Sequence, residues 1–206
     1  MVNEPGKTTD NTDKQGITRR RFIIGTMIVA IIGAFGSLLS LLKVLSPSKK
    51  GSGYVSTIEP GDLLVYASGS NIGMEIKASS FNVGDAELVY PKGKSSNPAN
   101  LVQLIKLNES DFKAPTDIQY TDKGFVAYSA ICTHLGCTVS WVKNTGSPDA
   151  SYTECFCHNS TFNPARGELV EGGPAPIPLA QIGVKVNDDD TLAFTSDFKG
   201  PIGPQV

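Results

Sequence analysis

All four cysteines and both histidines of this chain fall within residues 132–158. They form two groups, Cys132-Thr-His134-Leu-Gly-Cys137 and Cys155-Phe-Cys157-His158-Asn-Ser160. Thiolates and imidazoles are strong ligands for transition metals. Each group offers a Cys and a His two or three positions apart, in a stretch rich in Gly, Asn and Ser. Loops of this kind can direct two side chains at one centre, so the spacing predicts a shared site built from two loops.

Several chemistries compete for these residues. Two disulfides would use all four cysteines but leave the paired histidines unexplained. Tetrahedral zinc accepts two Cys and two His, and it leaves the other two cysteines without a role unless they pair. A four-cysteine cluster fits poorly, because two cysteines are separated by a single residue and both histidines would be idle. The remaining interpretation is a centre of two irons, with two thiolates on one and two imidazoles on the other: Cys132 and Cys155, His134 and His158.

The two groups resemble both boxes of the Rieske [2Fe–2S] family, and of its quinol-oxidising branch in particular. The run Gly173-Pro174-Ala175-Pro176 resembles the third element of that branch, a proline-rich loop over the cluster; a rigid surface turn is its alternative interpretation. The resemblance covers most of the chain, although residues 54–120 carry no specific motif. It implies one [2Fe–2S] cluster in loops within residues 132–178, and a disulfide between Cys137 and Cys157.

The resemblance also implies roles for side chains around the cluster. Ser160 matches the serine that donates a hydrogen bond to a bridging sulfide, and Leu135 would form an apolar rim. The family often has Tyr where this chain has Phe162, which cannot donate, so we expect a lower potential than in relatives with that Tyr. Asn159 replaces the usual Gly, and Asn tolerates a positive φ. The other residues expected to surround the cluster are Gly136, Gly173 and Pro174.

The activity implied by the resemblance is one-electron transfer in a respiratory chain. Two neutral imidazoles in place of thiolates raise the potential to about −150 to +300 mV, from about −400 mV in plant-type ferredoxins. A quinol bound to a cytochrome b partner would give an electron to the cluster and a proton to an exposed ligand histidine, His158 rather than His134. The head would then swing to a c-type cytochrome or another acceptor. The chain would be the redox subunit of a quinol-oxidising complex, without full turnover when isolated.

Two other functions fit parts of the pattern. The small Rieske subunit of a periplasmic molybdenum oxidase, of the arsenite-oxidase type, also combines these boxes with a twin-arginine signal. A membrane-tethered zinc or disulfide module with an adhesive role belongs to a different class. Colour separates the second from the first, since zinc is silent and a [2Fe–2S] centre is brown.

The elements that must position these groups are short strands. After residue 53 no amphipathic pattern of helical length occurs, and turn residues separate eight β-rich runs. These runs are Leu63–Tyr66, Ala86–Tyr90, Leu101–Leu107, Gly124–Ile131, Thr138–Val142, Leu169–Val170, Gly183–Val186 and Thr191–Phe194. The pattern predicts a mostly β protein, an antiparallel sandwich or barrel. With the resemblance, we expect a Rieske-type β-sandwich head (residues 54–206) carrying a small cluster-binding subdomain.

The N-terminal segment predicts a membrane anchor. Residues 1–17 form a polar tail, and residues 18–44 contain Arg19, Arg20 and Arg21 followed by 21 uncharged residues, Phe22–Leu42. Such a helix spans about 30 Å, the thickness of a bilayer core. The run Thr18–Ile23 resembles a twin-arginine export signal. Arginines before the span favour a single-pass protein of the cell membrane with a cytoplasmic N-terminus and an extracytoplasmic head, and residues 45–53 predict a flexible linker.

Composition excludes other classes. The 206 residues carry a net charge of −2, with eight Lys/Arg against three Asp/Glu in residues 1–50 and ten against seventeen in the remainder. A nucleic-acid-binding protein would need a basic face, which this acidic body does not offer. A single long apolar run also excludes a polytopic transporter.

Overall fold

The structure is a computed structural model that describes residues 23–24, 27, 53–146 and 150–205. The chain divides into two compact units, residues 1–49 and residues 50–206, and we call the second unit the head. In the first unit Ile23, Ile24 and Met27 are helical and exposed. Apart from these three residues and Gly53, the predicted tail, signal, anchor and linker lie outside the described residues. Within the described part of the chain, no helix has the length and apolar character needed to cross a membrane.

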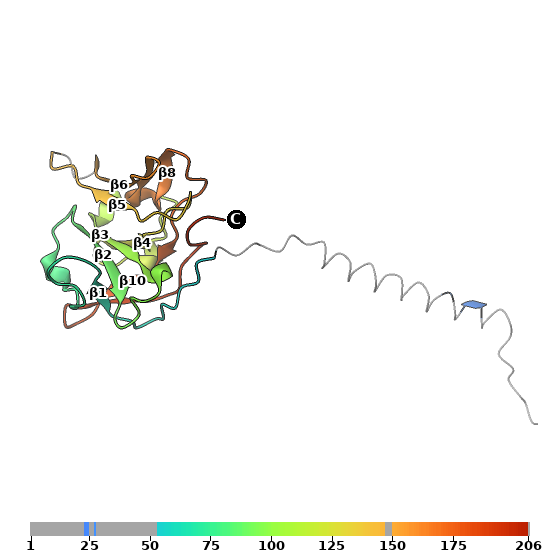
Figure 1. Cartoon of the computed structure of the whole chain (residues 1–206). Helices are drawn as coiled ribbons and strands as arrows, with labels where there is room; N and C mark the ends of the chain where they lie inside the picture. Colours follow the sequence, from blue (N-terminus) through green and yellow to red (C-terminus); the bar gives the residue numbers. More distant parts are fainter. Residues whose placement is uncertain (1–22, 25–26, 28–52, 147–149, 206) are drawn as a thin grey trace, which may run out of the picture. The chain divides into compact units, whose positions relative to one another are not determined.

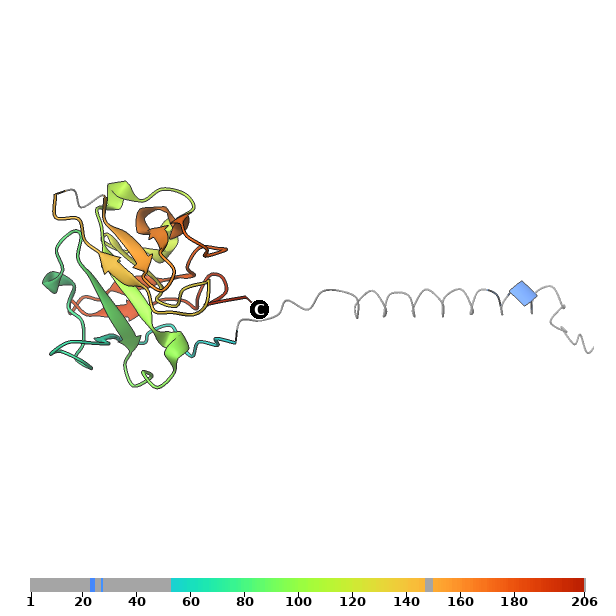
Figure 2. The same ribbon diagram turned by 45° about the horizontal axis from the view of Figure 1, so that its top comes forward.

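The described part of the head folds into three antiparallel sheets (Figures 1 and 2). A five-stranded sheet has the order β1 (Leu64–Tyr66), β2 (Ala86–Pro91), β3 (Val102–Lys106), β4 (Phe125–Ser129), β9 (Gln181–Ile182). A hairpin joins β10 (Val184–Val186) and β11 (Leu192–Phe194). A four-stranded sheet has the order β5 (Ser140–Val142), β6 (Tyr152–Cys155), β7 (Ser160–Asn163), β8 (Leu169–Gly172). The connections contain 3₁₀ turns η1 (Ala78–Ser80), η2 (Pro98–Asn100), η3 (Glu109–Asp111), η4 (Ile118–Tyr120) and η6 (Pro164–Arg166).

The five-stranded sheet is buried on both faces. Along β3, Val102 and Leu104 belong to one apolar core, whereas Ile105 belongs to the other. Successive side chains of a strand point to opposite faces, so the central strand separates a core under the β10–β11 hairpin from a core under the four-stranded sheet. The second core includes Cys132 and Cys155, which places the predicted site residues at its border.

The mostly β, antiparallel class is confirmed, and each of the eight predicted runs overlaps a strand. A turn at Asn187–Asp190 connects β10 and β11, with Asp190 at a φ of 69°. The prediction omitted three strands: β6, β7 and β9. Strands β6 and β7 carry Thr, Glu, Ser and Asn among their apolar residues. Their partners in the sheet, rather than apolar alternation, determine their extended conformation.

Candidate metal centre

The first cysteine–histidine group forms a closed turn before β5. An isolated bridge between Ile131 and Thr138 holds its ends together. Within the turn, the Cys132 amide donates to the Cys137 carbonyl at 2.8 Å, and the Gly136 amide donates to the Cys132 carbonyl at 3.0 Å. Gly136 has a φ of +82°, a conformation that glycine adopts without strain. We call residues 132–137 the first cluster loop.

The second group is the β6–β7 hairpin. Cys155 and Ser160 are the last paired residues of the ladder, so residues 156–159 form the turn, which we call the second cluster loop. Asn159 closes this turn with a φ of 56°, which confirms that Asn occupies a positive-φ position there. Strands β6 and β7, two of the three strands that the sequence interpretation missed, are therefore the elements that position half of the site.

Three connections hold the two cluster loops and the proline-rich segment together. Cys137 and Cys157 form a disulfide between the two cluster loops, as the resemblance implies. The hydroxyl of Thr133 donates to the Ile177 carbonyl at 2.7 Å, and the backbone amide of Ala175 donates to the Ser160 hydroxyl at 3.1 Å. Ser160 directly follows the second cluster loop and Ile177 directly follows the proline-rich run, so each of the three segments is connected to both of the others directly or through the adjacent residue.

The proline-rich segment approaches the second cluster loop closely at one glycine. A Cβ built on Gly173 would lie 2.5 Å from the Asn159 carbonyl oxygen and 2.5 Å from the Ser160 Cα. The φ of Gly173 is +80°. This position therefore requires glycine for both conformation and space, whereas Pro174 follows it in an exposed position.

The two histidines lie side by side. Their ring centroids are 4.6 Å apart and the ring planes meet at 85°. His158 is exposed and His134 is half-buried, whereas Cys132 and Cys155 are buried free cysteines. The free thiols of the site are thus buried, whereas the imidazole of His158 is exposed. Leu135 and Phe156 are 63% and 62% exposed, so large apolar side chains stand on both cluster loops.

These residues fit a metal or an iron–sulfur cluster. The Nδ1 atom of His134 is buried without a hydrogen-bond partner, and such an atom is stabilised if it coordinates a metal. Burial raises the pKa of Cys132 to about 11, with the neighbouring Cys155 adding to the rise. A bound cation supplies the positive charge that keeps such thiols ionised. The Sγ atom of Cys155 lies within 4.8 Å of those of Cys137 and Cys157, but the disulfide removes the latter two as ligands.

The sequence interpretation missed several residues that build this site. Thr133 lies inside the first group but was assigned no role. Phe156 was likewise overlooked, although its place between two cysteines was visible. Tyr54, whose hydroxyl approaches Gly136 of the first cluster loop, had no recognisable signal, because its position depends on a contact between segments far apart in the sequence.

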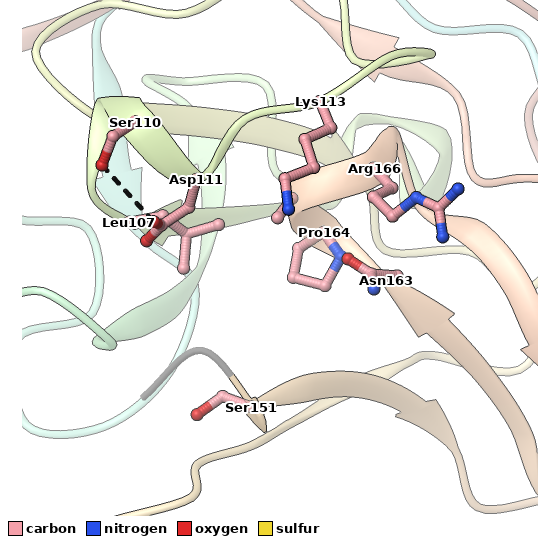
Figure 3. A pocket seen from close by; sticks show the side chains of 9 residues that line it. Leu107, Ser110, Asp111, Lys113, Ser151, Asn163, Pro164 and Arg166 are labelled. Carbon is pink, nitrogen blue, oxygen red and sulfur yellow. Dashed lines mark hydrogen bonds between the residues drawn. The ribbon is translucent and has the colours of Figure 1, made fainter. Parts of the chain in front are cut away.

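A separate cavity lies away from these residues. It has a volume of about 210 Å³, and its lining includes Lys113 and Arg166 (Figure 3). Lys113 reaches toward Pro164, whereas the guanidinium of Arg166 points away from the cavity. None of the lining residues belongs to either cluster loop, so this cavity is not part of the candidate centre.

Thiols and imidazoles that converge from two cross-linked loops are typical of zinc and iron–sulfur proteins. The structure by itself therefore places the chain among metal-binding β domains. The family model described as "Rieske [2Fe-2S] domain" matches residues 92–183. This range contains both cluster loops and the proline-rich segment.

Curated relatives agree with this match. The "Cytochrome bc1 complex Rieske iron-sulfur subunit" of Streptomyces coelicolor is 31% identical over 91% of this chain and 54% of its own length. The protein of the same name from Streptomyces lividans is 32% identical over 70% of this chain and 85% of its own length. The "Cytochrome b6-f complex iron-sulfur subunit" of Prochlorococcus marinus is 30% identical over 93% of this chain and 94% of its own length.

The chain belongs to the Rieske iron–sulfur family, and its cofactor is one [2Fe–2S] cluster. The alternative of a zinc or disulfide module is thereby excluded. The chain spans about half the length of the Streptomyces coelicolor relative.

Phe162 provides a test of how this chain adjusts its potential. The side chain is fully buried on β7, where it pairs with Thr153. We expect Phe162→Tyr to raise the midpoint potential, because a phenol hydroxyl that donates to a ligand sulfur stabilises the reduced state. A hydrogen bond worth about 1 kcal/mol corresponds to on the order of 40 mV for one electron. A redox titration of the two proteins measures this shift, and an unchanged midpoint would contradict the expectation.

Proposed function

We propose that this chain is a one-electron carrier that takes electrons from quinol at a cytochrome b-type partner. In this proposal Cys132 and Cys155 bind one iron, and His134 and His158 bind the other. The electrons pass to a c-type cytochrome or another high-potential acceptor. The names of the bc1 and b6-f relatives support this assignment.

The observation that carries the proposal is the exposure of His158 beside half-buried His134, on loops whose free cysteines are buried. A bound [2Fe–2S] cluster supplies a one-electron acceptor at this position. An exposed imidazole nitrogen can accept a hydrogen bond from a quinol hydroxyl and then hold its proton. The exposed side chains of Leu135 and Phe156 would exclude water when the two cluster loops meet an apolar surface of the partner. The hydrogen bond between the imidazole and the quinol is stronger in such a water-poor contact.

We further propose that Ser160 adjusts the cluster. Its fully buried hydroxyl accepts from the Ala175 amide at 3.1 Å, so its own proton is free to be directed at a sulfide. Gly136, Gly173 and Pro174 shape the surrounding loops, as described above.

The proposed arrangement in the cell follows the sequence. Residues 18–44 would carry a twin-arginine signal and anchor the chain in the cell membrane, with residues 1–17 in the cytoplasm and the head outside. Residues 45–53 would act as a hinge that lets the head move between partners. In this setting the chain is one subunit of a quinol-oxidising complex.

The proposal is tested by electron paramagnetic resonance of the dithionite-reduced full chain, followed by titration of its midpoint potential against pH. We expect a reduced [2Fe–2S] signal with an average g value below that of the free electron. We also expect a potential in the upper part of about −150 to +300 mV. The potential should fall as pH rises above the pKa of a ligand histidine in the oxidised state, because reduction then takes up a proton.

The outcomes separate the claims. A low midpoint that does not change with pH would keep the Rieske cluster and reject quinol as the electron donor. Loss of the paired-histidine spectrum in His158→Cys, with the cluster retained, would support the ligand assignment. An unchanged spectrum in that variant would reject His158 as a ligand.

A further inference from the structure

The chain enters the head directly beside the first cluster loop. The head is described from Gly53 onward, and Tyr54 is half-buried against the core that contains Cys132. A Cβ built on Gly136 would lie 2.6 Å from the Tyr54 hydroxyl oxygen and 3.4 Å from the Tyr54 Cζ. The backbone of the first cluster loop therefore rests on the tyrosine hydroxyl.

The C-terminal segment packs against the ring carbons of the same tyrosine. A Cβ built on Gly203 would lie 2.8 Å from Cδ2 of Tyr54 and 3.0 Å from Cγ2 of Ile131. Pro204 lies 3.6 Å from the Cβ position of Gly136. Figures 1 and 2 show the end of the chain beside the incoming segment in both views. Tyr54 is thus wedged between the first cluster loop and residues 202–204.

The residues after Tyr54 are attached to the body of the head. The Val55 carbonyl accepts from the Asn97 side chain at 2.9 Å. The Thr57 amide donates to Oδ1 of the fully buried Asn100 at 2.8 Å, and the Asn100 side chain returns a bond to the Thr57 hydroxyl at 2.9 Å. Tyr54 therefore directly precedes a segment that is fixed to the body of the head.

We propose that Tyr54 is a positioning residue that supports the conformation of the first cluster loop. The inference rests on the proposed function for the ligand roles of Cys132 and His134. The turn that holds these two residues is closed by the amide of Gly136 on the Cys132 carbonyl. When Tyr54 moves, Gly136 loses its support, and the ligands on this loop change their orientation relative to the second cluster loop.

The test uses the full chain with its cluster bound. It measures the midpoint potential, the electron paramagnetic resonance spectrum and the rate at which the cluster is lost. We expect Gly136→Ala to accelerate cluster loss by roughly tenfold or more, because the new methyl group meets the Tyr54 hydroxyl in an overpacked site. Tyr54→Phe alone keeps the ring, so it should change these quantities less than Tyr54→Ala does. In Gly136→Ala combined with Tyr54→Phe, the nearest atom of the ring lies 3.4 Å from the new Cβ. The cluster should therefore be lost more slowly than in Gly136→Ala alone.

If Gly136→Ala takes up no cluster, Tyr54→Ala is measured instead. It should shift the midpoint potential and the g values, whereas Tyr66→Ala serves as the matched control. Tyr66 is also half-buried, and its hydroxyl contacts Ser80 rather than a cluster loop. Equal effects of Gly136→Ala in the wild-type and Tyr54→Phe backgrounds, or an unchanged midpoint and spectrum in Tyr54→Ala, would overturn the inference. A wild-type chain without a histidine-ligated signal would instead overturn the proposed function.

Discussion

Gly173→Ala is expected to release the proline-rich segment from the second cluster loop and to leave the protein unable to retain its cluster. The new Cβ would lie 2.5 Å from two backbone atoms, the Asn159 carbonyl oxygen and the Ser160 Cα, and 2.7 Å from the Ser160 amide nitrogen. Backbone atoms cannot rotate away as side chains do, so the segment must move as a whole. It then loses the bond from the Ala175 amide to the Ser160 hydroxyl. We expect a cost of about 3 kcal/mol or more, from overpacking and strain together.

Gly69→Ala is the matched control for this variant. Gly69 has a φ of +81°, against +80° for Gly173, and a Cβ there would meet nothing within 4 Å. It therefore carries the same backbone strain, about 1 to 2 kcal/mol, without the collision. Visible absorption and the resonance signal of the purified full chains measure cluster content. Equal cluster content in the two variants would show that the close approach at Gly173 is not needed to retain the cluster.

Glu168→Gln is expected to increase the free energy of unfolding of the head relative to wild type, by an amount that grows as pH rises. Glu168 is fully buried, and its Oε1 accepts from the Thr153 hydroxyl at 2.7 Å while its Oε2 has no partner. Burial, with a smaller contribution from Glu171, raises the pKa of Glu168 from 4.5 to about 8, and the Thr153 bond opposes the rise. The folded protein therefore keeps a proton that the unfolded chain releases above pH 4.5.

The sign of the pH dependence follows from this difference in bound protons. Below about pH 4.5 Glu168 is protonated in both the folded and the unfolded protein, so its titration costs no stability. Between about pH 4.5 and pH 8 the free energy of unfolding falls, because only the unfolded chain releases the proton. The loss at pH 7 is on the order of 3 kcal/mol. Glutamine cannot ionise, so the stability gain of Glu168→Gln over wild type should be larger near pH 8 than near pH 5. Urea denaturation of the full chain at both pH values measures it.

Glu171→Gln is the control for the charge change. Glu171 is exposed and accepts from the Asn163 side chain at 2.8 Å, so its replacement should change stability little at either pH. A gain in Glu168→Gln that is the same at both pH values would contradict the raised pKa. Among the described residues, Glu168 is the only buried acidic side chain.

The chemistry of the site could be predicted from the sequence because it is local. Cys132 and His134, like Cys155 and His158, are close along the chain, so their spacing alone indicates a shared centre. The strands of the five-stranded sheet were predictable for a similar reason, since runs such as Val102–Lys106 are apolar and bounded by turns. The positive φ at Asn159 followed from the conformational range of Asn.

The tertiary structure alone decided the rest, because it depends on contacts between distant segments. Strands β6 and β7 are polar, and they are extended because their neighbours pair with them. Sequence patterns do not reveal that Tyr54 and Gly203 meet beneath the first cluster loop, or that Gly173 touches Asn159. The full burial of Glu168, in a turn where Gly167 and Glu168 both have a positive φ, has no signal in the sequence either. Residue types and their spacing thus determined which chemistry the chain performs, whereas packing decided how the loops that perform it are supported.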